Sequence, residues 1–113
     1  MEQCERALAL LRELGDDDGV ADTLNSTGFA RTKLGFYAEA VSDYSAALDL
    51  WKESGSDFHR ATTLSQMGDT YRAAGDFAAA RAVWGRALAI LEALDHREAG
   101  DVRGKLSGLD AVS

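Results

Sequence analysis

The sequence predicts an all-α protein built from stacked helical hairpins, and three observations lead to that fold class. The 113 residues include no proline, and Ala, Leu, Arg, Glu and Asp dominate long stretches. These residues favour helix because their side chains lose little rotamer freedom there. Small and large residues recur at a spacing of forty, and single glycines divide each forty-residue unit into two amphipathic runs.

The forty-residue repeat becomes visible when the sequence is compared with itself. A shift of forty places Leu24 on Leu64 and Gly28 on Gly68. The shift also pairs Ala21 with Ala61, Thr23 with Thr63, Gly35 with Gly75, Ala40 with Ala80, Tyr44 with Trp84, Ala47 with Ala87 and Leu48 with Leu88. The repeat therefore extends over most of the chain, which predicts a helical solenoid in one domain.

The repeat predicts four segments in chain order. They are residues 1–14 as the second helix of a partial repeat, 20–54 and 60–94 as two full repeats, and 98–112 as a partial repeat or a capping helix. We call 20–54 the second unit and 60–94 the third unit. The last segment has an apolar face of Val102, Leu106 and Leu109, although its glycines weaken the helix. The acidic run Asp16–Asp18 is expected to form a solvated loop with a helix cap.

Glycines are predicted to end the first helix of each unit. Gly75 reaches positive φ without steric cost, and Asp76 is placed to cap the following helix with its carboxylate. Gly35 has the same role in the second unit, but Phe36 stands in place of the aspartate, so that cap is expected to be missing.

Two further glycines, Gly28 and Gly68, are expected inside helices, where Gly costs about 1 kcal/mol relative to Ala. Close approach of the partner helix is the expected compensation. The small residues on that helix are Ala40, Ala47, Ala80 and Ala87, and the aromatic residues expected to fill the space between hairpins are Tyr37, Tyr44, Phe77 and Trp84.

These residues resemble the tetratricopeptide repeat family. The third unit carries its signature as Leu64, Met67-Gly68, Tyr71, Gly75, Phe77, Ala80, Trp84 and Ala87, and the second unit as Leu24, Thr27-Gly28, Arg31, Gly35, Tyr37, Ala40, Tyr44 and Ala47. Arg31 departs from the pattern, since an aromatic is usual there. The period of forty is similar to the longer repeats of kinesin light chains and of bacterial regulators, including actinobacterial ones. Lys52 and Glu92 stand where the family's closing proline would be.

The resemblance implies an α-α superhelix and a protein-interaction scaffold that binds a peptide or protein partner on its concave face. It also implies that the chain is a fragment or subunit of a larger bacterial regulator. The implied partner-binding residues are Asn25, Phe29, Thr32, Lys33, Ser65, Gln66, Asp69 and Arg72. Asn25 is the strongest candidate because a side-chain amide offers both a donor and an acceptor to a peptide backbone.

Two alternative functions stay open at this stage. One is a self-assembling module that forms homo-oligomers by pairing its open repeat ends. The other is a regulatory domain that senses a small peptide. The carboxylate clamp of chaperone-binding members is not expected, because Phe29 and Asp69 stand where those members carry asparagine.

Composition and motifs argue against other classes of function. A net charge of −7 disfavours nucleic-acid binding by this segment. His59 and His96 are expected at loops or helix starts without a catalytic triad, and Cys4 has no metal-ligand neighbours. We therefore expect no enzyme, no cofactor and no metal. No apolar run is long enough to span a membrane, and the lone cysteine forms no internal disulfide, so a cytoplasmic protein is expected.

Overall fold

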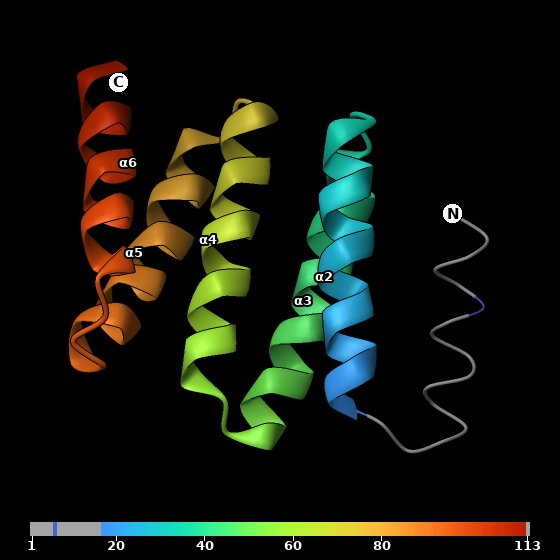
Figure 1. The fold of residues 1–113 in the computed structure, drawn as a ribbon. Helices are drawn as coiled ribbons and strands as arrows, with labels where there is room; N and C mark the ends of the chain where they lie inside the picture. Colours follow the sequence, from blue (N-terminus) through green and yellow to red (C-terminus); the bar gives the residue numbers. More distant parts are fainter. Residues whose placement is uncertain (1–5, 7–16, 113) are drawn as a thin grey trace.

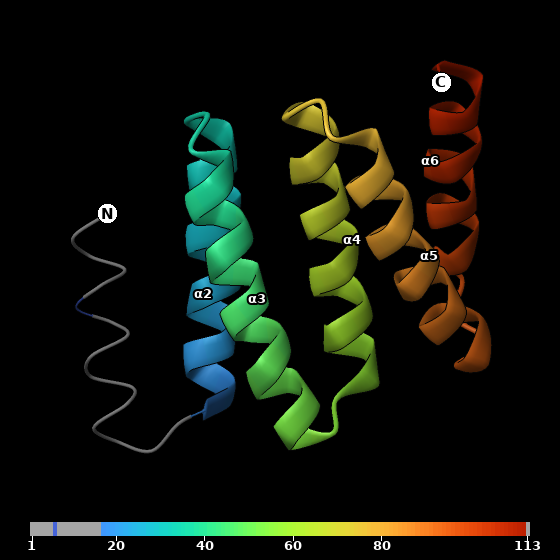
Figure 2. The same ribbon diagram turned by 180° about the vertical axis from the view of Figure 1, so that it is seen from behind.

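The computed structural model describes residue 6 and residues 17–112, and the latter form a series of helices joined by short turns. They are α2 (Asp17–Lys33), α3 (Tyr37–Ser54), α4 (Asp57–Ala73), α5 (Phe77–Ala93) and α6 (Glu98–Val112). α2 packs mainly on α3, and α4 on α5, as two hairpins that meet where α3 contacts α4. α2, α4 and α6 lie side by side in one layer, with α3 and α5 in a second layer behind them (Figures 1 and 2). The all-α hairpin fold is thus confirmed.

The turns within the two hairpins follow the sequence prediction. Gly35 and Gly75 both have a φ of 84°, in the left-handed region. The carboxylate of Asp76 accepts a hydrogen bond from the Ala79 amide at 3.2 Å and so caps α5. Phe36 precedes α3 without any side-chain cap, so both cap predictions are confirmed.

Close packing around Gly68 and Gly28 compensates for glycine in the helix interior. A Cβ at position 68 would overlap the indole of Trp84, and one at position 28 would lie 2.9 Å from the ring of Tyr44. Trp84 is fully buried, and its Nε1 donates a hydrogen bond to the Ser65 carbonyl at 3.0 Å. The second helix of each hairpin therefore approaches the first through one aromatic ring.

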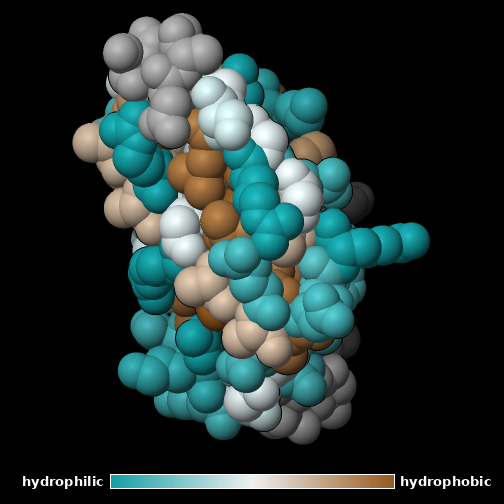
Figure 3. All heavy atoms as spheres, turned by 90° about the vertical axis from the view of Figure 1, so that its left-hand side faces the viewer, coloured by the Kyte–Doolittle hydropathy of each residue, from teal (hydrophilic) through white to brown (hydrophobic). Residues whose placement is uncertain are grey.

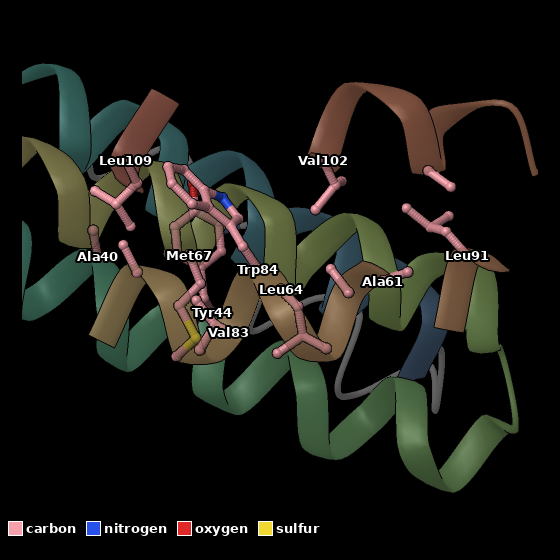
Figure 4. Packing of buried hydrophobic residues seen from close by; sticks show 13 residues of the cluster. Ala40, Tyr44, Ala61, Leu64, Met67, Val83, Trp84, Leu91, Val102 and Leu109 are labelled. Atoms are coloured by element: carbon pink, nitrogen blue, oxygen red, sulfur yellow. The ribbon is translucent and has the colours of Figure 1, made fainter. Parts of the chain in front are cut away.

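The hydrophobic core runs through both layers of helices. Figure 4 shows Met67, Val83 and Tyr44 meeting at one end of the cluster, while Val102 and Leu109 of α6 add to it from the next helix. The predicted small residues Ala40, Ala47, Ala80 and Ala87 are all completely buried. On the α6 side, a strip of hydrophobic atoms runs between hydrophilic flanks (Figure 3).

The predicted role of Tyr37 and Phe77 as core aromatics is wrong. Phe77 is 39% exposed, and Tyr37 is only partly buried. Each is the first residue of its helix, at a hairpin turn on the rim of the stack, so no neighbouring helix extends over it. The core aromatic that sequence reasoning missed is Trp51, which is buried near the end of α3 and stacks on His59 with ring centroids 4.4 Å apart.

The acidic run does not form the expected loop over its described part. Asp17 and Asp18 belong to the first turn of α2, where the helix dipole favours negative charge. Asp16 and Cys4 lie outside the described residues, and so does the predicted helix at 1–14 except for Arg6. Along the described helices, no stretch combines the length and the apolar character that crossing a membrane requires.

Candidate functional site

The candidate site is the surface of the layer that contains α2, α4 and α6, which we call the α2–α4–α6 face. All eight predicted binding residues lie on α2 or α4. Three of them, Ser65, Gln66 and Asp69, line a hollow of about 200 Å³ between α4 and α6. The structure therefore brings part of the predicted set together around one depression.

Two of the predicted residues on α2 are used to hold α2 against α4. The Thr63 hydroxyl donates to Asn25 Oδ1 at 3.1 Å, and the hydroxyls of Thr32 and Thr70 are hydrogen bonded at 2.7 Å. Thr63 and Thr70 are completely buried. Part of the acceptor capacity of Asn25 is thus used within the fold, and its NH₂ group is the donor that it offers to a ligand.

A buried phenol lies beneath this seam between the two helices. Burial raises the pKa of Tyr44 above its usual value, and hydrogen bonds from Thr32 and Thr70 oppose the shift. Tyr44 is 1% exposed, so its hydroxyl belongs to the interior. Thr32 thus links the surface to the core, and its part in the fold is structural.

The central cation of the hollow, Lys105 on α6, was missed by sequence reasoning. Its ammonium lies 3.0 Å from the Asp69 carboxylate and donates to the Ser65 hydroxyl at 3.1 Å. It also sits 5.8 Å from the centroid of the Trp84 ring. The sequence did contain a signal for it. Asn25 and Ser65 are predicted binding residues, and a shift of forty residues places Lys105 at the same repeat position.

Gln66 supplies the one unsatisfied acceptor in the hollow. Its Oε1 is buried and has no hydrogen-bond partner among the described residues. A buried acceptor without a donor costs free energy of about 1–3 kcal/mol. A ligand N–H that reached this atom would remove that cost, so the position favours a donor such as a peptide amide.

The charge of the hollow is negative. Asp69, Glu98 and Asp101 line it against the single ammonium of Lys105. Since Lys105 pairs with Asp69, the carboxylates of Glu98 and Asp101 on α6 remain as the excess charge. The hollow therefore favours a cationic group on whatever occupies it.

The remaining predicted residues lie apart from the hollow. Phe29 is 54% exposed on α2, with the Lys33 ammonium 5.2 Å from its ring centroid. This cation–π contact holds Lys33 over its own helix. The Arg72 side chain is exposed near the end of α4, with no hydrogen-bond partner in the described part of the chain. These three residues border the face without lining the hollow.

One serine lies beside a histidine in the structure, but the pair does not have the arrangement of a catalytic triad. Ser56 Oγ is 2.5 Å from Nδ1 of His59 at the start of α4. One face of the imidazole stacks on Trp51. Within residues 17–112, no carboxylate is seen to bond the second ring nitrogen. Within the same residues no group of three potential metal ligands occurs.

The stacked hairpins define a helical repeat protein in which a layer of first helices forms one face and a layer of second helices the other. Residues 19–93 match the sequence model of the tetratricopeptide repeat. The chain therefore belongs to the tetratricopeptide repeat family, whose repeats mediate protein–protein interaction and are typically non-enzymatic. No protein among those with curated descriptions matches the chain in sequence.

Proposed function

We propose that this chain is a scaffold that binds an extended peptide segment of a protein partner on the α2–α4–α6 face. A basic side chain of the segment occupies the hollow between α4 and α6. The binding set consists of Asn25, Phe29, Thr32, Lys33, Ser65, Gln66, Asp69 and Arg72, with Lys105 added. The proposal includes the four segments at 1–14, 20–54, 60–94 and 98–112, and a place in a larger cytoplasmic bacterial regulator.

The observation that carries the proposal is that Gln66, whose Oε1 is buried and unpaired, lines the same hollow as the carboxylate residues Glu98 and Asp101. A peptide supplies both missing groups, since its backbone N–H donates to the amide oxygen and a lysine or arginine side chain meets the carboxylates. The NH₂ group of Asn25 lies on the same face and offers a donor to a peptide carbonyl.

A selection from random twelve-residue peptides tests the proposal. Peptides that bind the full chain are synthesised, and their affinities are measured by fluorescence anisotropy. We expect selected peptides to be rich in Lys and Arg. Gln66→Leu and the double variant E98Q/D101N should each weaken binding at least tenfold, which corresponds to about 1.4 kcal/mol.

The matched control is E39Q/E53Q, which removes two exposed carboxylates from α3. It changes the net charge equally but leaves the hollow intact, so its affinity should stay within twofold of the wild type. If both double variants lose affinity equally, the attraction comes from overall charge and the proposed site is wrong. Failure to select any peptide would also contradict the proposal.

A second candidate function, self-association, is favoured by Gly108. Tyr44 covers Gly28 and Trp84 covers Gly68, but no described residue comes within 4 Å of a Cβ placed at Gly108. α6 thus resembles the first helix of a hairpin, but no aromatic ring from a second helix packs on its glycine. In this function the predicted second helix at 1–14 of another copy, which contains Leu8 and Leu11, supplies the missing partner of α6. Light scattering tests it: the mass should rise with concentration and return to the monomer value in L8E/L11E. A constant mass would reject it.

A further inference from the structure

A second hollow, larger than the first, lies on the other side of α4 from the α2–α4–α6 face. Its volume is about 470 Å³, and α3, α4 and α5 all contribute to its wall. From α4 it takes Arg60, Met67 and Tyr71, whereas the first hollow takes Ser65 and Asp69. With 3.6 residues per turn, these two sets lie on opposite sides of the helix, so the two hollows are separate.

The second hollow is cationic although the chain carries a net charge of −7. Lys52, Arg60 and Arg86 surround it, and Asp49 is its one carboxylate. Within residues 17–112, no hydrogen bond or ion pair is seen for the side chains of Lys52 and Arg86. Arg60 makes only a 3.3 Å contact with the exposed carboxylate of Asp57. Three cations therefore face one carboxylate in this hollow, which leaves an excess of positive charge.

Packing of the repeat does not require these cations. The shift of forty places Glu92 at the position of Lys52 and Gly100 at that of Arg60, and Ala46 corresponds to Arg86. Most of the apolar wall changes too: Leu48 recurs as Leu88, but Met67 and Tyr71 correspond to Thr27 and Arg31. The combination of three cations with this apolar wall is therefore particular to one junction.

We infer that this hollow is a second binding site and that its ligand is an acidic peptide segment with an apolar side chain. Carboxylates of the segment pair with Lys52, Arg60 and Arg86, and the apolar side chain packs on Met67 and Tyr71. A nucleic acid is disfavoured because the acidic chain repels a long polyanion. The apolar wall favours a peptide over a small inorganic anion. The inference rests on the proposed function only in taking a peptide as the ligand.

The test uses a labelled hexapeptide of alternating Glu and Leu, with the Gln and Leu hexapeptide as its uncharged counterpart. Binding to the full chain is measured by fluorescence anisotropy at two salt concentrations. We expect the Glu peptide to bind at least tenfold more tightly than the Gln peptide, with the difference shrinking at high salt. The double variant K52Q/R86Q should lose at least tenfold in affinity, while circular dichroism shows an unchanged fold.

The control double variant is R97Q/R103Q, which removes two exposed cations that line neither hollow and should leave affinity within twofold. A further double variant, K33Q/R72Q, removes two exposed cations from the α2–α4–α6 face. A larger loss in K33Q/R72Q than in K52Q/R86Q would place the acidic peptide on that face and overturn the inference. Equal affinity for the Glu and Gln peptides would overturn it too. The inference would also fail if inorganic pyrophosphate displaced the labelled Glu peptide as effectively as the unlabelled peptide does. The proposed function is tested by peptides whose affinity falls in E98Q/D101N, and this inference by a peptide whose affinity falls in K52Q/R86Q, so either proposal can fail without the other.

Discussion

The guanidinium of Arg31 lies 2.9 and 3.0 Å from the two carboxylate oxygens of Asp43, and this ion pair joins α2 to α3. In the third unit the corresponding residues are Tyr71 and Val83, which line one hollow together. The departure of Arg31 from the family pattern is therefore matched by a change in its contact partner. An ion pair in one hairpin replaces an apolar contact in the next.

This relationship predicts that Arg31 and Asp43 can be replaced without loss of stability only when both are replaced together. Asp43→Val leaves the guanidinium, which is 26% exposed, without its partner and should lower the free energy of unfolding by about 1–2 kcal/mol. R31Y/D43V installs the contact of the third unit and should restore the wild-type value or exceed it. Urea unfolding measures both. A double variant as unstable as the single one would show that the two sites act independently.

The same pair predicts how stability depends on pH. Burial raises the pKa of Asp43 above its ordinary value of 3.8; Arg31 opposes the shift and Glu39 adds to it. A raised pKa means that the folded state binds the proton more tightly than the unfolded state. The contribution of Asp43 to the free energy of unfolding is therefore greatest below pH 3.8. It is lost as the pH rises through the raised pKa that Asp43 has in the folded state.

R31Y/D43V lacks this titrating group and provides the comparison. Its stability minus that of the wild type should grow as the pH rises from below 3.8 and become constant above the raised pKa. Urea unfolding at a series of pH values measures the difference. A difference that falls with rising pH would mean that Arg31 outweighs burial and lowers the pKa of Asp43.

Substitutions of glycine by alanine should differ in sign according to position. Gly68→Ala forces the buried indole of Trp84 away and breaks its hydrogen bond to the Ser65 carbonyl, so we expect a loss of about 2 kcal/mol or more. Gly28→Ala should cost less, because a Cβ 2.9 Å from the Tyr44 ring overlaps it less than a Cβ at position 68 overlaps the Trp84 indole. Gly104→Ala has open space and should gain up to about 1 kcal/mol. Thermal unfolding ranks the three, and equal effects would contradict the packing account.

The two hairpin turns offer a matched pair of cap substitutions. Asp76→Ala removes the hydrogen bond to the Ala79 amide and should lower stability by about 1 kcal/mol. Phe36 is 54% exposed and has backbone angles close to those of Asp76, so Phe36→Asp should add about 0.5–1 kcal/mol. Chemical denaturation measures both, with Phe36→Ala as the control for loss of the ring. If Asp and Ala at position 36 give the same stability, no cap has formed.

Much of the site could be anticipated from the repeat, but its chemistry could not. The resemblance to the family implied that Ser65, Gln66 and Asp69 share the binding face, and the helical period is consistent with their lying on one side of α4. It did not reveal that Asn25 and Thr32 are tied to α4. Whether a surface polar group is free or bonded depends on which side chain of the neighbouring helix meets it. That meeting depends on the angle and offset between helices.

The sequence by itself determined the all-α class, the hairpin turns at Gly35 and Gly75, and the close approach at Gly28 and Gly68. Each of these follows from local backbone preference or from a repeated size pattern. Only the tertiary structure decided that Trp51 is in the core while Phe77 is on the rim. It also brought Lys105 to Asp69 and gathered Lys52, Arg60 and Arg86 around one hollow. Burial and charge clustering depend on contacts between helices far apart in sequence, which no local pattern encodes.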